Sequence, residues 1–247
     1  MNLSNDVRDK IQPEQRVREP LHILVLALVV LQIVIAVVAF PFLPLMVPIH
    51  WNAAGQIDEY ASRWVNTLLF PALSLGLYLL LRVVSALGPR LGGRASSAAN
   101  AQVRTTLLVA LLLFMLILQL CVTAISLGMV IDMAFTLNLA LALLFLVIGN
   151  FLGKTRRNFW MGIRTPWTLA SSLVWERTHR IGGWLFVAVG LLGIPYSFVP
   201  ALRPWGLLAL ILLVAVFLYG YSYWCYQQNT VEEREPVSPP FDEPDEE

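Results

Sequence analysis

The segment LLVALLLFMLILQLCVTAISLGMVIDMAFTLNLALALLFLVIG, residues 107–149, is apolar almost throughout. A helix needs about 20 apolar residues to cross a bilayer, so this segment is too long for one crossing and long enough for two. Gly128 and Asp132 interrupt it near the middle, where a turn would separate two helices. We therefore expect a helical hairpin in a membrane, with its tip at these two residues.

The composition of the whole chain is also that of a membrane protein. Of its 247 residues, 57% are hydrophobic and only 13% are charged, whereas a soluble domain carries about 25% charged residues. The net charge of +1 gives no electrostatic reason to expect a nucleic-acid partner. Cys121 and Cys225 lie within or at the end of apolar runs, and we expect both to be free thiols.

Six segments are apolar enough over a sufficient length to span a bilayer. They are 21–47, 67–87, 105–131, 133–152, 182–199 and 205–226. Proline disturbs the helix that precedes it, so the first span should end near Pro41 or Pro44. The expected fold class is an all-α integral membrane protein with six transmembrane helices.

Lys and Arg are concentrated on alternate connections between these spans. Cytoplasmic loops of membrane proteins carry an excess of both residues. Of the 17 Lys and Arg residues, all but Arg63 and Arg203 lie in the N-terminal segment, in 82–104, in 153–181 or in the tail. We therefore expect both termini and connector 153–181 in the cytoplasm, and loop 48–66 outside the cell.

This topology divides the chain into four parts. They are a cytoplasmic N-terminal tail (1–20), a two-helix module (21–104), a four-helix module (105–227) and a C-terminal tail (228–247). The C-terminal tail is acidic and proline-rich, a composition that cannot bury enough apolar surface to fold. We expect both ends of the chain to be disordered.

The outer loop PIHWNAAGQIDEYASRW, residues 48–64, combines charged groups with aromatic side chains that suit a membrane interface. Gly55 permits a tight turn between its two polar clusters. Three interpretations are open: a binding surface, an interfacial loop with His50 bonded to neighbouring backbone, or a metal site formed by His50 and Asp58. Zinc normally takes three or four ligands, so we expect no metal here.

The inner connector contains a second unusual segment, NFWMGIRTPWTL, residues 158–169. Thr165 followed by Pro166 is the pattern of a helix N-cap and first helical residue. We expect a short helix over 166–180, lying on the membrane or re-entering it. The residues that would share one face of this helix are Thr168, Ser172, Trp175 and His179.

Glu176 fits two kinds of interaction on that helix. It could pair with Arg180 one turn later, or form a Glu-x-x-His pair with His179, a spacing that di-metal bundles use twice. One copy is present, so we expect an ion pair. The charge pattern places His50 and Asp58 on the other side of the membrane, so no composite catalytic site is expected.

Few polar residues lie inside the predicted spans. They are Gln32, Ser74, Gln119, Thr123, Ser126 and Asn138. Interhelical hydrogen bonds account for residues of this kind. No Asp, Glu, Lys or Arg lies well within a span, which disfavours an ion-coupled transporter, because transport pathways bury ionisable groups.

Two stretches carry longer motifs. In LPLMVPIHWNAAGQIDEYASR (43–63), the pattern Pro-x-His-aromatic-Asn-x-x-Gly-x-x-Asp is formed by Pro48, His50, Trp51, Asn52, Gly55 and Asp58. The second motif begins with Gly149-Asn150 and continues with Asn158, Gly162, Ile163, Arg164, Thr165, Pro166, Trp167, Trp175, Thr178 and His179. Both resemble the Sdp immunity-protein (SdpI) family of bacterial membrane proteins. The chain departs from the family pattern at Arg157, where proline is common, and at Ser172 or Leu173, where an acidic residue is frequent.

The resemblance implies a multi-pass protein of the bacterial cell membrane that protects its host against a secreted peptide toxin. It also implies that toxin presence can be relayed to a transcriptional repressor, as in some members. The expected partners are the lipid bilayer, a peptide toxin outside, and a repressor or anionic lipid at the cytoplasmic face. We expect neither enzymatic activity nor a cofactor.

Two sets of residues are the candidates for these interactions. The extracellular binding loop comprises Pro48, His50, Trp51, Asn52, Gly55, Asp58 and Arg63. The cytoplasmic motif comprises Asn150, Asn158, Gly162, Arg164, Thr165, Pro166, Trp167, Trp175, Glu176, Thr178 and His179. Two alternatives stay open: a membrane enzyme acting on a lipid or peptide, through His50 with Asp58 or Glu176 with His179, and a transporter of small molecules or peptides.

Overall fold

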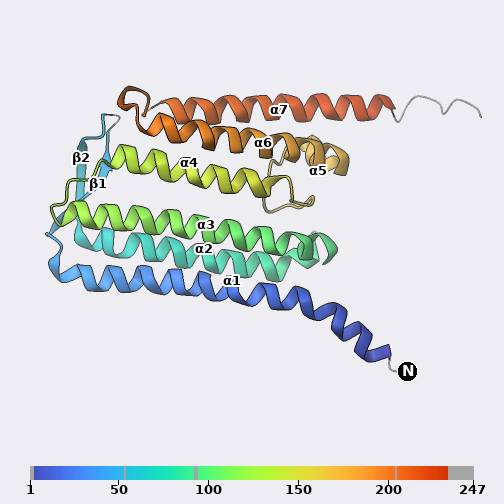
Figure 1. The fold of residues 1–247 in the computed structure, drawn as a ribbon, viewed down its shortest axis with the longest axis horizontal. Helices are drawn as coiled ribbons and strands as arrows, with labels where there is room; N and C mark the ends of the chain where they lie inside the picture. Colours follow the sequence, from blue (N-terminus) through green and yellow to red (C-terminus); the bar gives the residue numbers. More distant parts are fainter. Residues whose placement is uncertain (1–2, 53, 92–93, 204, 233–247) are drawn as a thin grey trace, which may run out of the picture.

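A computed structural model describes the backbone of residues 3–52, 54–91, 94–203 and 205–232 (Figure 1). Six long helices dominate it, and each contains a stretch long and apolar enough to cross a membrane. They are α1 (Leu3–Ala39), α2 (Arg63–Leu91), α3 (Arg94–Ser126), α4 (Met133–Leu152), α6 (Ser172–Ser197) and α7 (Gly206–Glu232). The prediction of six spans is confirmed.

The helices lie side by side as two groups of three (Figure 1). Helices α1, α2 and α3 share a buried cluster that includes Val25, Leu81 and Leu112. Helices α4, α6 and α7 share another, which includes Val189 and Leu218. The groups meet along α3 and α4, and we call this line of contact the seam.

The predicted hairpin between the third and fourth spans is confirmed. Helix α3 ends at Ser126 and α4 begins at Met133. Gly128 has a φ of +92°, which an L side chain rarely adopts. The side chain of Asp132 caps α4 by accepting a hydrogen bond from the Phe135 amide at 2.9 Å.

The loop after α1 is folded into a strand pair, which the all-α prediction did not include. Helix α1 ends at Ala39, and a 3-10 turn (Phe40–Phe42) follows at Pro41, as expected. Strands β1 (Met46–Trp51) and β2 (Ile57–Ser62) then pair antiparallel. Aromatic and β-branched residues such as Val47 and Tyr60 favour this pairing, and the turn between the strands contains Gly55, with a φ of +77°.

The helix predicted over 166–180 is wrong in its extent. Helix α5 covers only Pro166–Ala170, and α6 begins at Ser172 and continues through the membrane span. Ser171, between them, is extended (φ −127°, ψ 130°) and its hydroxyl accepts a hydrogen bond from the Val174 amide. Ser171 therefore ends one helix and caps the next, because a short hydroxyl side chain competes with helical hydrogen bonding.

The ends of the chain are more helical than expected. Helix occupies 3–20 and 228–232, which were predicted to be disordered, and 233–247 lie outside the described residues. The start of α1, the end of α7 and α5 lie at one end of the bundle, and the strand pair lies at the other (Figure 1). This arrangement agrees with termini on one side of the membrane and the β1–β2 strand pair on the opposite side. This strand pair is called the hairpin from here on.

Small residues allow α4 and α6 to pack unusually closely. A Cβ added to Gly149 would lie 2.6 Å from the Val187 nitrogen and 2.7 Å from the Gly183 oxygen. A Cβ added to Gly190 would lie 2.7 Å from the Ala142 oxygen. Backbones that approach this closely gain dispersion contacts, which drive helix association in lipid.

Buried polar side chains join the three N-terminal helices. Ser74 of α2 donates to Gln32 Oε1 of α1 at 2.6 Å. Gln32 Nε2 in turn donates to the Leu112 carbonyl of α3 at 3.1 Å, and Gln119 Nε2 of α3 donates to the Gln32 carbonyl at 2.9 Å. The interhelical role predicted for these glutamines is confirmed. Asn138, by contrast, bonds within its own helix, to the Ala134 carbonyl.

Removal of the Ser74 hydroxyl should destabilise the bundle. We expect Ser74→Ala to lower the free energy of unfolding by about 1 kcal/mol, because the buried Gln32 oxygen loses its donor. The matched control is Ser126→Ala, whose hydroxyl bonds to the Val122 carbonyl of its own helix. Unfolding in mixed micelles measures both, and equal losses in the two variants would contradict the interhelical role.

Candidate functional site

The outer motif brings His50 and Asp58 together across the strand pair. His50 Nδ1 and Asp58 Oδ1 are 2.6 Å apart, and both side chains are substantially exposed. The interfacial-loop interpretation had proposed a bond from His50 to the backbone. His50 instead bonds to the Asp58 carboxylate. Among the described residues, no group of three His, Cys, Asp or Glu side chains could hold a metal.

Asn52 and Gly55 shape the turn between the strands. The Asn52 side-chain oxygen accepts hydrogen bonds from the Ala54 and Gln56 amides at 2.9 and 3.0 Å. The Gly55 amide donates to the Asn52 carbonyl at 2.9 Å. Asn side chains stabilise turns in this way, so this part of the motif fixes the hairpin conformation.

The remaining outer motif residues attach the hairpin to the helices. Pro48 is buried in β1, and Trp51 packs against a cluster formed by α2, α3 and α4 residues. Arg63 donates to the Leu43 carbonyl at 3.3 Å and lies over the Phe40 ring at 4.4 Å. Arg63 therefore holds the base of the hairpin against the end of α1.

The inner connector begins with a loop organised by Asn158. Its side-chain oxygen accepts from the Trp160 and Met161 amides at 2.8 and 2.9 Å, and its nitrogen donates to the Arg156 carbonyl at 2.8 Å. Asn100 of α3 bonds to both backbone groups of Arg156, at 2.8 and 2.9 Å. Asn100 thus ties the connector to the other side of the seam.

His179 lies at the centre of the connector and is fully buried. The Ile163 amide donates to its Nε2 at 2.9 Å, while Nδ1 lies 2.8 Å from the Trp175 carbonyl. One nitrogen accepts and the other donates, so the ring is the neutral Nδ1–H tautomer. Both nitrogens are occupied, and His179 has no lone pair left for a metal or a proton transfer.

Gly162 and Trp175 complete the surroundings of His179. The Trp175 ring stacks on His179 with centroids 3.9 Å apart, and its Nε1 donates to the Thr155 carbonyl at 3.0 Å. Gly162 has a φ of +103°, and an added Cβ would lie 2.4 Å from His179 Nε2. The motif therefore requires glycine here for two reasons, conformation and space.

Thr165 and Pro166 begin α5 as predicted. Thr165 and Thr168 cap each other reciprocally, and Thr165 Oγ1 also lies 3.1 Å from the Ser222 hydroxyl of α7. Trp167 packs against two tyrosines of α7, Tyr219 and Tyr223, with centroids 5.1 and 4.9 Å apart. The start of α5 is thereby fixed to α7.

Three arginines of the connector bind groups within the protein. Arg156 pairs with Glu176 at 2.9 Å, so the predicted Glu176–Arg180 pair is wrong. Arg157 stands where proline is common in the family pattern. It donates to the Leu169 and Ala170 carbonyls at the end of α5, and so has a structural role that proline could not fill. Arg164 is exposed and donates to the Phe159 carbonyl at 2.7 Å.

The last motif residues differ from one another in their surroundings. Asn150 is exposed on α4. Thr178 is fully buried, and its hydroxyl has no hydrogen-bond partner in the described part of the chain. The common face predicted for Thr168, Ser172, Trp175 and His179 does not form, because Ser172 is exposed while the other three are buried.

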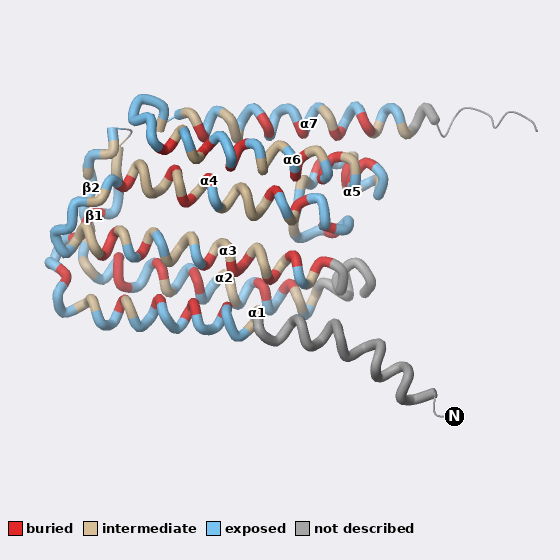
Figure 2. The backbone as a smooth tube through the Cα atoms, in the orientation of Figure 1, coloured by how far each residue is buried: buried red, intermediate tan, exposed pale blue. Residues whose placement is uncertain are grey.

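The two motifs lie at opposite ends of the bundle (Figure 1). His50 and Asp58 are at the hairpin end, and Glu176 and His179 are at the α5 end. The composite catalytic set, which the charge pattern had argued against, is not assembled. The hairpin is largely exposed, whereas buried residues are frequent where the connector meets α6 (Figure 2).

Alanine at Gly162 should disrupt the connector. We expect Gly162→Ala to cost at least about 1 kcal/mol more unfolding free energy than Gly128→Ala, because both strain the backbone but only the first displaces His179. Gly128 also has a positive φ, but an added Cβ there would meet nothing within 4 Å. Thermal unfolding in detergent and proteolysis of the connector test this, and equal costs would contradict it.

Comparisons with known proteins agree with both motifs. The SdpI/YfhL protein family matches residues 154–223, and a domain of unknown function (DUF1648) matches residues 27–75. Immunity protein SdpI of Bacillus subtilis (strain 168) is 24% identical over 177 residues, which are 72% of this chain and 81% of that protein. No solved structure matches. By its six apolar helices the chain is a multi-pass membrane protein, and it resembles the SdpI/YfhL protein family over residues 154–223.

Proposed function

We propose that this protein protects the membrane of a bacterial cell against a secreted peptide toxin. The observation that carries the proposal is the similarity to Immunity protein SdpI, which extends over 81% of that protein. In this proposal the hairpin end faces the outside and meets the toxin. The fixed turn at Asn52 and the exposed His50–Asp58 pair supply a rigid surface for recognition.

The arrangement of the inner motif supports binding rather than catalysis. His179 uses both ring nitrogens, and Glu176 is engaged by Arg156. We propose that the connector is a cytoplasmic platform that contacts a transcriptional repressor or anionic lipid. Phe159 and Arg164 are exposed on it and offer apolar and cationic contacts.

The primary test compares toxin sensitivity of the host with and without this gene. Secreted peptides encoded by neighbouring genes serve as the challenge. We expect deletion to increase killing, and a chain with residues 48–62 replaced by a Gly/Ser linker to fail to restore resistance. Membrane abundance of the variant is the control, and a deletion strain with unchanged sensitivity would contradict the proposal.

The inner platform can be tested separately from protection. We expect Arg164→Ala to leave toxin resistance unchanged and to reduce co-sedimentation of a DNA-binding regulator with membranes when toxin is present. Arg203→Ala, at the other end of the bundle, is not a suitable control because it ion-pairs with Asp132. Arg180→Ala, exposed on α6 beside the same membrane face, is the better comparison.

A second candidate function, an enzyme acting on a peptide or lipid, rests on the His50–Asp58 bond. A carboxylate at 2.6 Å orients an imidazole as in general-base catalysis. Under the binding proposal, His50→Gln weakens protection by roughly tenfold or less. Loss of about a hundredfold, with peptide binding intact and cleavage products absent, would favour the enzyme instead.

A further inference from the structure

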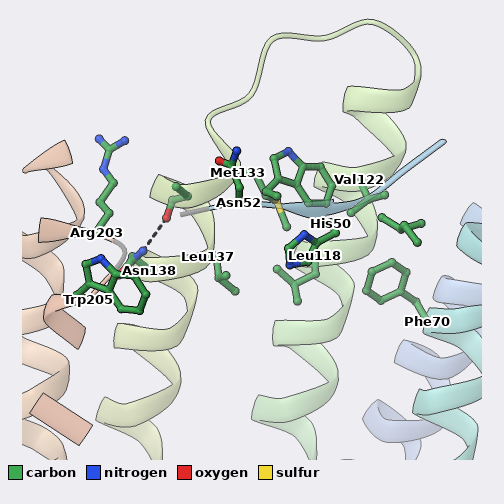
Figure 3. Close-up of a pocket in the computed structure, with 13 residues that line it drawn as sticks. His50, Asn52, Phe70, Leu118, Val122, Met133, Leu137, Asn138, Arg203 and Trp205 are labelled. Atoms are coloured by element: carbon green, nitrogen blue, oxygen red, sulfur yellow. Dashed lines mark hydrogen bonds between the residues drawn. The ribbon is translucent and has the colours of Figure 1, made fainter. Parts of the chain in front are cut away.

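A pocket of about 520 Å³ lies beneath β1 at the hairpin end of the bundle (Figure 3). Its interior is mainly apolar and includes Phe70 of α2, Leu118 and Val122 of α3, and Met133 and Leu137 of α4. Ligand sites typically have volumes of about 300–1,000 Å³ and apolar linings with a few polar groups. The volume and lining are those of a binding site.

The polar groups of this pocket come from three separate segments. His50 belongs to β1 and Asn52 follows it directly, Asn138 belongs to α4, and Arg203 to the connection between α6 and α7 (Figure 3). The pocket therefore spans the seam, with α2, α3 and the hairpin on one side and α4 and Arg203 on the other. A ligand inside it would contact both groups of helices.

The charges around the pocket favour a cationic ligand. Arg203 is neutralised by its ion pair with Asp132, and it also donates to the Ser197 carbonyl at 2.7 Å. Asp58 is exposed and held at 2.6 Å by His50, which lines the pocket. The outer segments contain the acidic residues Asp58, Glu59 and Asp132 against Arg63 and Arg203, so acidic residues exceed arginines.

We propose that this pocket binds an apolar segment of a cationic amphipathic peptide, with a Lys or Arg of the peptide placed beside Asp58. The proposal rests on the proposed immunity function and assigns the toxin a chemical class. Peptides of this class concentrate at anionic membrane surfaces, with their apolar face at the level of the lipid interface. Such a peptide would present apolar side chains near the depth of the pocket.

Site-specific crosslinking tests where the peptide binds. The full chain is placed in phosphatidylcholine nanodiscs with photoreactive benzoylphenylalanine at position 137, or at 143 as the control. Leu143 lies on the same helix, outside the pocket, and is 46% exposed. The probes are a biotinylated Lys/Leu amphipathic peptide and its Glu/Leu counterpart.

We expect the Lys/Leu peptide to attach at position 137 roughly tenfold more than at 143, and more than the Glu/Leu peptide does. Equal attachment at the two positions, or attachment of lipid alone at 137, would overturn the proposal. The second outcome would show that an acyl chain occupies the pocket.

Charge variants test the position of the cationic group. Asp58→Asn keeps the shape and the acceptor for His50 but removes the charge, and we expect several-fold less attachment of the Lys/Leu peptide at position 137. Glu59→Gln is the matched control, because it removes the same charge from the next residue of β2 and leaves the His50–Asp58 contact in place. Equal effects of the two substitutions would refute the role of Asp58.

A protection assay separates this proposal from the immunity proposal. Leu137→Trp fills the pocket and should reduce toxin resistance by roughly tenfold or more, whereas Leu143→Trp should not. Thermal unfolding of both variants checks that they fold. If wild type protects and Leu137→Trp protects equally, the pocket proposal fails and immunity stands. If wild type does not protect but position 137 captures the Lys/Leu peptide, the pocket stands and immunity fails.

Discussion

The bilayer offers no water to the groups that lie within it, and this constraint determines most of the structure. Each polar group in the hydrocarbon region must find its partner inside the protein. The backbone does so by forming six long helices. Polar side chains do so by bonding to one another and to the backbone of neighbouring helices. The side-chain amide and the backbone carbonyl of Gln32, for example, link three helices through Ser74, Leu112 and Gln119.

The same constraint explains the inner motif. The connector enters the bundle at its end, where His179 accepts from the Ile163 amide and donates to the Trp175 carbonyl. A buried loop would otherwise leave backbone amides unpaired, at a cost of about 1–3 kcal/mol each. His179, Trp175 and Asn158 therefore serve as partners for the backbone, and Gly162 provides the space that this requires.

Periodicity and composition predicted those features that depend on neighbours in the chain. The spans, the turn at Gly128 and Asp132, and the cap at Thr165 are of this kind. The break at Ser171 was missed because its sequence also fits a continuous helix. The ion pair of Glu176 was assigned to Arg180 from helical spacing, but Arg156 is supplied by another part of the connector.

Hydrogen bonds between residues that lie far apart in the chain could not be predicted from the sequence alone. Asn100 and Ser222 are polar residues at helix positions with no motif around them, yet they bond to the connector from α3 and α7. The strand pair was also missed, although its residues favour strands. Its length is short, and two strands are stable only when they pack on another surface, which here is provided by the ends of α2, α3 and α4.

The two ends of the molecule are connected through the seam, and this gives the proposed relay a physical route. Helices α4 and α6 approach so closely at Gly149 and Gly190 that they should move as one body. Under the proposal, a peptide in the outer pocket contacts both sides of the seam, and its binding would favour the position of this body relative to α3 that fits the peptide better. At the inner end, the Asn100–Arg156 hydrogen bonds cross the same seam and hold the connector. A shift along α3 and α4 would therefore act on the platform directly, through those two bonds.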